Sequence, residues 1–210
     1  MRQHCQGAVN PPNRNRHPTV AWQNDRRRES AMKVALYGAS GMVGSRILRE
    51  LIVRKHQVTA VVRNPVDVSE PEATVLQGDV FEESSVMATA KGMEAAISAY
   101  GPGHTRAEAL LLPTRTLLAG LQKVGVQRFL MVGGAGSLEV APGVRLVDTP
   151  TFPAEWKPIA LAHAEALAKL QASNLDWTSV SPSAFLQPGQ RTGTFRLGKD
   201  SLLTKWRRRK

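Results

Sequence analysis

The chain has 210 residues, a formal net charge of +11 and a single cysteine, Cys5. This length suits one α/β domain with a buried core, and one cysteine excludes an internal disulfide. Most of the positive charge lies at the two ends: residues 1–31 carry +4 and residues 205–210 carry +5, which leaves +2 for residues 32–204. A domain that binds nucleic acid carries its charge on a folded face, so we expect no specific nucleic-acid partner.

Residues 1–31 have no hydrophobic period and are rich in Pro, Asn and Arg, so we expect a disordered N-terminal extension. Its Arg-rich composition also fits a targeting peptide, but we favour Met32, directly before the first predicted strand, as the working start. No apolar run is long enough for a membrane span or a secretory signal, and no Cys/His cluster has zinc spacing. We therefore predict a cytoplasmic protein with no membrane contact and no metal.

Strands and helices alternate from Met32 onward. The hydrophobic patterns predict strands at 33–38, 57–63, 73–80, 95–101, 128–134 and 176–183, and helices at 42–55, 84–92, about 105–124 and 158–173. Because these strands are almost continuously apolar and alternate with helices, residues 32–204 are expected to form an α/β domain. Its doubly wound parallel sheet should be covered on both faces. Pro and aromatic residues in 142–156 predict a loop that forms one wall of a substrate pocket.

The first strand–helix turn reads GASGMVG, with Gly38, Gly41 and Gly44 spaced three apart. In a parallel sheet this turn lies at the carboxyl edge, where ligands bind. Gly38 suits a tight turn, Gly41 the close approach of a pyrophosphate, and Gly44 close packing of the helix on the strand. A P-loop is excluded because the turn has no Gly-Lys-Ser/Thr. A dinucleotide site is favoured over a turn that serves packing alone.

The end of the second predicted strand indicates which dinucleotide binds. Proteins that bind NAD place Asp or Glu there to hold the ribose 2′-hydroxyl. Here the strand ends in Arg63, and the nearest acid, Asp67, lies beyond Pro65. A guanidinium matches a 2′-phosphate, so we prefer NADP(H) over NAD(H). The alternative is that Arg63 is only a solvated charge at the strand end.

The segments YGASGMVG, VVRNP, LQGDV, VGGAGSLEV and LDWTSVSPSAF occur in this order between about Met32 and Leu203. In this order they resemble the atypical short-chain dehydrogenase/reductase superfamily, with its NAD(P)-binding Rossmann fold. The closest likeness is to the NmrA-like, NAD(P)H:flavin reductase and biliverdin-reductase-B-like group. At the end of the chain the likeness stops, and KWRRRK stands where such proteins continue with a strand and a helix. We therefore expect a truncated C-terminal end, an exposed apolar patch, and a homodimer or aggregation.

This resemblance implies which residues bind the dinucleotide. Around the pyrophosphate it places Gly38, Ala39, Ser40, Gly41, Met42 and Val43, and it gives the adenosine phosphate to Arg63. Near the adenine it places Asp79 and Val80, and beneath the ribose and nicotinamide Ser98, Ala99, Tyr100 and Gly101. Toward the nicotinamide it adds Gly133, Gly134 and Ala135. Two of these have other readings: Asp79 as the N-cap of the next helix and Tyr100 as a packing residue with a hydrated hydroxyl.

The proton donor of the superfamily is missing. Many short-chain dehydrogenases carry Tyr-x-x-x-Lys, but here the corresponding helix has His163 near the expected Tyr and Leu167 four residues on. His163 is either a general acid or a packed histidine. The resemblance also implies that Ser137 lies near the nicotinamide, and the alternative is that it is merely a loop residue. Both remain candidate catalytic residues.

A flavin or quinone accepts hydride directly, and water can supply the proton. We therefore predict an NADPH-dependent reductase of flavin-like or quinone-like acceptors. The alternative is a non-catalytic redox sensor of the NmrA type that binds NAD(P) without turnover. An epimerase or dehydratase acting on a nucleotide sugar is less favoured, because the chain has no room for a substantial substrate domain.

Overall fold

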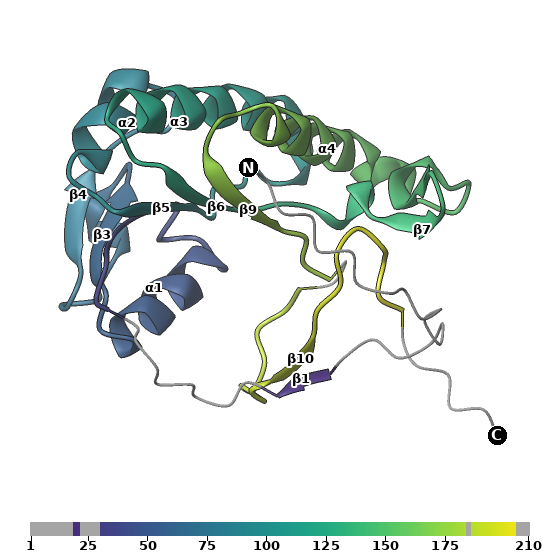
Figure 1. Cartoon of the computed structure of the whole chain (residues 1–210), viewed down its shortest axis with the longest axis horizontal. Coiled ribbons are helices and arrows are strands. Elements are labelled where there is room, and N and C mark those ends of the chain that lie inside the picture. The colour runs from purple at the N-terminus through teal and green to yellow at the C-terminus, as the bar shows by residue number, and fades with distance from the viewer. Residues whose placement is uncertain (1–18, 22–29, 184–185, 205–210) are drawn as a thin grey trace, which may run out of the picture.

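A computed structural model describes residues 19–21, 30–183 and 186–204, with the backbone alone at 19–21 and 104–105. Its centre is a six-stranded sheet in the order β4-β3-β2-β5-β6-β9 (Figure 1), in which every neighbouring pair is parallel. The strands are β2 (Lys33–Tyr37), β3 (Gln57–Val62), β4 (Thr74–Gln77), β5 (Ala95–Ser98), β6 (Arg128–Val132) and β9 (Asp176–Val180). The chain winds outward from β2 to β4, then returns to β5 on the other side of β2. The predicted doubly wound α/β fold is therefore confirmed, with its switch point between β2 and β5.

The α-helices cover the two faces of the sheet unequally. α2 (Glu83–Ala90), α3 (Leu111–Lys123) and α4 (Lys157–Gln171) lie on one face, and α1 (Gly44–Val53) lies on the other (Figure 1). Short 3-10 turns join them: η1 (Pro65–Asp67), η2 (His104–Leu110), η3 (Ala135–Ser137), η4 (Leu146–Asp148) and η5 (Ala154–Trp156).

Each face of the sheet has its own core, because successive residues of a strand point to opposite sides. On the face of α2, α3 and α4, Tyr37 and Phe129 are buried with Leu121. On the α1 face, Leu36 packs with Leu48. Burial raises the pKa of Tyr37 to about 12, although its hydrogen bond with Thr89 acts in the opposite direction. The Tyr37 hydroxyl lies 3.1 Å from Oγ1 of Thr89 and so links β2 to α2. A neutral tyrosine therefore joins these two elements.

The predicted helix at 105–124 is shorter than expected, since α3 begins only at Leu111. Residues 104–110 form the 3-10 segment η2, in which Arg106 has non-helical angles (φ −131°, ψ 51°). Pro113 explains the late start: proline lacks an N–H and fits an α-helix only in its first turn, which is where a start at Leu111 places it. The other predicted helices and strands overlap the observed ones.

Two small ribbons lie outside the main sheet. β1 (Thr19–Ala21) pairs antiparallel with β10 (Thr194–Arg196), so three residues of the segment expected to be disordered form a strand. β7 (Glu139–Ala141) pairs with β8 (Val144–Arg145), which places part of the predicted loop 142–156 in a hairpin. The rest of residues 1–29 and the basic tail 205–210 lie outside the described residues. Among those described, no helix is both long and apolar enough to cross a membrane.

Candidate functional site

The glycine turn joins β2 to α1 at the carboxyl edge of the sheet. Gly38 has φ +77°, and a Cβ on it would lie 2.9 Å from the carbonyl carbon of Ala99, so both its conformation and its surroundings require glycine. A Cβ on Gly44 would lie 2.0 Å from the Gly38 carbonyl oxygen, which confirms the predicted close packing at this position. Gly41 is different: its Cβ would meet only the Gly38 oxygen, at 3.3 Å. The turn therefore leaves room for a ligand beside Gly41, although the Gly41 N–H itself donates to the Gly38 carbonyl at 3.1 Å.

The N-terminus of α1 follows this turn and is free of competing groups. Val43, at the N-cap position, makes no side-chain capping bond, and the first turn contains no acidic residue. Backbone N–H groups and the helix dipole there favour an anion. Together with the room beside Gly41, this arrangement suits a phosphate group.

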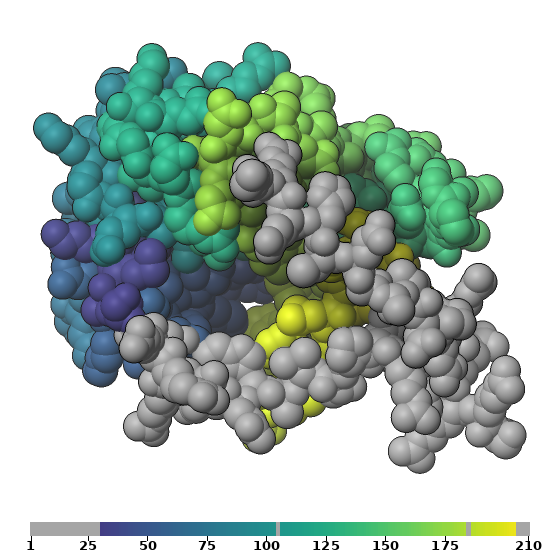
Figure 2. Space-filling model, viewed as in Figure 1, coloured from purple at the N-terminus to yellow at the C-terminus, as the bar shows by residue number. Residues whose placement is uncertain are grey.

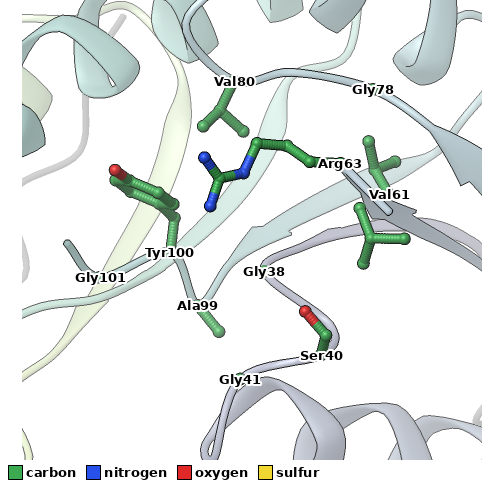
Figure 3. A pocket seen from close by; sticks show the side chains of 11 residues that line it. Gly38, Ser40, Gly41, Val61, Arg63, Gly78, Val80, Ala99, Tyr100 and Gly101 are labelled. Atoms are coloured by element: carbon green, nitrogen blue, oxygen red, sulfur yellow. The ribbon is translucent and has the colours of Figure 1, made fainter. Parts of the chain in front are cut away.

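A cavity of about 180 Å³ opens beside the turn (Figure 3). It spans the carboxyl ends of β2, β3, β4 and β5, which is the switch point of the sheet. In Figure 3 the side chain of Arg63 reaches into this space toward Val80 and Tyr100, and the Ser40 hydroxyl points into it. Its lining residues are Gly38, Ser40, Gly41, Val61, Val62, Arg63, Gly78, Val80, Ala99, Tyr100 and Gly101.

Arg63 supplies the positive charge of this cavity. Its guanidinium makes no ion pair within the described part of the chain, while its backbone carbonyl accepts a hydrogen bond from Gln77 at 3.2 Å. None of the described residues that line the cavity carries a carboxylate. An unpaired guanidinium in a cavity without acids suits a phosphate dianion better than a ribose hydroxyl.

Tyr100 forms the wall next to Arg63. Burial raises the pKa of this phenol, although the positive charges of Arg63 and Arg106 oppose the shift. The ring packs edge-to-face on Phe81 with 5.9 Å between centroids, and the hydroxyl donates to the Ala109 carbonyl at 3.4 Å. The hydroxyl is therefore bonded within the protein, and the ring both packs on a neighbour and lines the cavity.

Asp79 does not cap the next helix, so that alternative reading is wrong. α2 begins at Glu83 with Glu82 as its N-cap. Asp79 instead accepts a hydrogen bond from the Phe81 N–H at 2.9 Å, and its own N–H donates to Ser85 at 2.8 Å. These bonds shape the loop after β4, whose neighbouring residues Gly78 and Val80 line the cavity.

The two candidate catalytic residues lie near the end of β6. His163, on α4, packs against Gly134, where an added Cβ would lie 3.0 Å from the His163 Cβ. Its Nδ1 is buried and has no hydrogen-bond partner among the described residues, and burial lowers the pKa of this imidazole. Ser137 ends η3 and is half-buried. In the described structure no hydrogen bond joins these two side chains.

The structure divides the predicted dinucleotide residues into two groups. Those that line the cavity are Gly38, Ser40, Gly41, Arg63, Val80, Ala99, Tyr100 and Gly101. Those that lie outside its lining are Ala39, Met42, Val43, Asp79, Ser98, Gly133, Gly134 and Ala135. Ala39 and Ser98 are buried beneath the edge, whereas Gly133 and Gly134 continue β6 toward the nicotinamide end expected from the resemblance.

Three lining residues were not predicted: Val61, Val62 and Gly78. The two valines immediately precede Arg63, so their place at the end of a buried strand was a usable signal. At Gly78 a Cβ would lie 2.6 Å from Val61, so only the packing of β4 on β3 shows why glycine stands there. No residue of 142–156 lines this cavity.

Comparisons with known proteins agree with this geometry. The model of the NAD(P)H-binding family matches residues 38–207. A candidate exported protein from Burkholderia pseudomallei is 45% identical, with 82% of each chain covered and a TM-score of 0.75. A candidate epimerase from Bacteroides thetaiotaomicron is 40% identical over 83% of this chain and 81% of its own, also at 0.75. A candidate NADH-flavin reductase from Streptococcus pneumoniae is 36% identical, with 77% of each chain covered and a TM-score of 0.68.

Proposed function

The chain belongs to the NAD(P)H-binding family, and from that premise we propose an NADPH-dependent reductase of flavin-like or quinone-like acceptors. The observation that carries the cofactor half of this proposal is the glycine turn beside an acid-free cavity that contains Arg63. The acceptor half rests on the missing proton donor, since the helix that contains His163 has no Tyr-x-x-x-Lys motif. Each half has its own test.

The residues of the turn and cavity would hold the cofactor. The room beside Gly41 and the uncapped N-terminus of α1 suit the pyrophosphate, and the Arg63 guanidinium suits the 2′-phosphate. Val80 and the Tyr100 ring offer apolar walls to the adenosine. When bound, NADPH supplies a hydride from its nicotinamide.

The proton donor decides the class of acceptor. His163 lies near the position where the resemblance places the catalytic tyrosine, and because burial lowers its pKa it is neutral near pH 7. A neutral imidazole is a poor general acid, which disfavours carbonyl acceptors that need a proton in the same step. Flavins and quinones take hydride on an electron-poor ring and then a proton from water. One relative is named as a flavin reductase, which supports this choice, and another is named as an epimerase.

Turnover tests the proposal directly. Purified protein should oxidise NADPH, followed at 340 nm, when FMN, riboflavin or menadione is added as acceptor. NADPH binding should be measured in parallel by isothermal titration. Tight NADPH binding without turnover on any acceptor would reject the reductase in favour of a non-catalytic redox sensor. Without any NADPH or NADH binding, both readings would be wrong.

Cofactor preference tests the role of Arg63. Arg63→Glu should weaken NADPH binding at least tenfold and leave NADH binding equal or tighter, because a carboxylate repels the 2′-phosphate and accepts from the ribose hydroxyl. Arg115→Glu, an exposed change on α3, is the matched control for an equal change in net charge. An unchanged ratio of the two affinities in Arg63→Glu would assign the 2′ position to another residue.

A further inference from the structure

A second cavity, of about 290 Å³, lies between α1 and the segment that follows β9. Figure 2 shows the molecular surface hollowed between the blue atoms of the α1 region and the yellow C-terminal segment. Its walls come from α1 and the turn before it on one side, and from residues 186–188 on the other. The lining residues are Met42, Val43, Arg46, Ile47, Glu50, Leu186, Gln187 and Pro188.

The walls of this cavity are mostly apolar and remain accessible. Met42 is 48% exposed and Leu186 is 44% exposed, although both are large hydrophobic residues. Small-molecule sites are typically apolar clefts of about 300–1,000 Å³ with a few convergent polar groups. The cavity, at about 290 Å³, lies just below the lower end of this range, so it suits a compact ring system of two or three fused rings.

The charges at the cavity are not balanced. Glu50 is ionised and already paired: burial pushes its pKa upward, but hydrogen bonds from Arg54 and Arg191 outweigh this and leave the pKa below its ordinary value. These contacts measure 2.7 Å to Arg54 and 2.6 Å to Arg191. Arg46 has no such partner, since in the described part of the chain its guanidinium bonds only the Met42 carbonyl. Arg46 therefore presents to the cavity a positive charge that no described carboxylate pairs with, beside apolar walls.

We propose that this cavity binds a planar aromatic molecule that carries a carbonyl or anionic group on one edge, with that group on Arg46. Flat apolar rings match the walls formed by Met42, Ile47 and Leu186, and an electronegative edge matches the guanidinium. Oxidised quinones and the isoalloxazine ring of flavins share this chemistry. The identification of this ligand as the hydride acceptor rests on the proposed function. The cavity adjoins the candidate cofactor site, because Met42 and Val43 also belong to the glycine turn.

Direct binding tests the cavity without relying on turnover. Anthraquinone-2-sulfonate and neutral menadione are titrated in equilibrium dialysis, without cofactor, against wild type and four variants. Arg46→Gln should weaken sulfonate binding about ten- to hundredfold and menadione binding much less, because only the sulfonate loses a charge-assisted bond. Arg46→Lys should retain most of the sulfonate affinity. Leu186→Trp should weaken both probes by filling the cavity.

The matched control is Arg49→Gln, which removes an equal charge from α1 at a position paired with Glu70, away from the cavity lining. It should bind both probes as wild type does. Thermal melts establish that each variant is folded. Equal binding of both probes by Arg46→Gln, Leu186→Trp and wild type would overturn the proposal, as would the absence of any binding to wild type.

Turnover assays on the same proteins separate this proposal from the proposed function. Reduction of quinones by wild type with unaltered acceptor KM in Arg46→Gln and Leu186→Trp would leave the reductase standing and overturn the cavity as its acceptor site. The predicted changes in probe binding without any turnover would support the cavity and reject the reductase.

Discussion

Gly41 and Gly44 lie three residues apart in one turn, yet they differ in how much space a side chain would have. The added Cβ at Gly44 would overlap the Gly38 carbonyl oxygen, with only 2.0 Å between the atoms. At Gly41 the corresponding distance is 3.3 Å, and its φ is not in the left-handed region. A side chain at Gly41 thus needs only a shift of a few tenths of an ångström in the free protein, whereas glycine at position 44 is required by the fold itself.

Gly41→Val should leave the melting temperature within about 2 °C of wild type and reduce NADPH affinity at least tenfold. The reason is that the branched side chain occupies the space a phosphate needs. Gly44→Val should instead lower stability by about 3 kcal/mol, because backbone must shift to relieve the overlap. Thermal melts and isothermal titration of both variants distinguish the two effects. Wild-type NADPH binding by folded Gly41→Val would contradict a phosphate site at this turn.

The buried imidazole of His163 links the stability of the protein to pH. Its buried Nδ1 has no partner in the described structure, and burial lowers its pKa below the ordinary value of 6.5. Below pH 6.5 the unfolded chain therefore takes up a proton that the folded protein resists. The contribution of His163 to the free energy of unfolding is therefore constant above pH 6.5. It falls as the pH drops toward the lowered pKa of the folded state.

Replacing His163 by Met should remove this part of the pH dependence. Wild type should lose more stability than His163→Met between pH 7 and pH 5, as measured by urea unfolding at each pH. On the proposed reductase, kcat with menadione should fall less than about tenfold, since a true general acid contributes about 10²–10⁴-fold. Parallel stability curves would contradict the burial argument, and a hundredfold loss of kcat would make His163 the proton donor.

At the scale of elements, the packing of α2 on α3 depends on Gly120. A Cβ there would lie 2.7 Å from Cγ1 of Val86, on α2. Valine is stiff at χ1, so it cannot swing away without strain. The close approach of the two helices supports the loop after β4, because the Thr116 hydroxyl on α3 donates to the Val80 carbonyl. This contact connects helix packing with one wall of the candidate cofactor site.

Gly120→Ala should destabilise the wild type by about 1–2 kcal/mol, since overpacking outweighs the gain in helix propensity. In a Val86→Ala background the same change should cost less than in the wild type, because Cγ1 is gone, although the Cβ of residue 86 would still lie 3.0 Å away. Denaturant midpoints of the four proteins measure this difference. Equal effects in both backgrounds would show that the two helices do not meet as described.

Much of the element order could be predicted from the sequence, because each strand is a short apolar run and each helix a periodic one. Val34 to Tyr37 and Val58 to Val62 are buried on both faces, which is what a continuous run indicates. The start of α3 could have been predicted from Pro113. The match to the family confirms the resemblance to the atypical short-chain dehydrogenase/reductase superfamily.

The site could be predicted where the signal is backbone geometry or a strand end, as at Gly38, Gly41 and Arg63. It could not be predicted where distant segments meet. The neighbourhood of His163 and Gly134 depends on how α4 packs against the end of β6. The cavity beside Arg46 depends on residues 186–188, which have no helix or strand pattern. NADP(H) preference, the acceptor, a homodimer and a cytoplasmic location stay predictions.

For the whole molecule, the unequal covering of the sheet is the dominant feature. The prediction was a sheet covered by helices on both faces, but α1 is the one described α-helix on its side (Figure 1). Phe129 and Met131 of β6 are buried toward α2, α3 and α4, so Leu130 and Val132 point to the other face. There they pair in register with the edge strand β9, where Val180 is 52% exposed. We expect this partly apolar edge to act as a surface for self-association.

We therefore expect the protein to form dimers or larger species through this edge, because covering exposed apolar surface removes it from water. Val180→Lys should weaken the association, since lysine on an edge strand disfavours pairing with another chain. Sedimentation velocity over a range of concentrations measures the effect. Val66→Lys is the control: Val66 is 83% exposed in η1, away from β9, and its replacement should leave association unchanged. A clean wild-type monomer with a cooperative melt above about 60 °C would contradict this prediction.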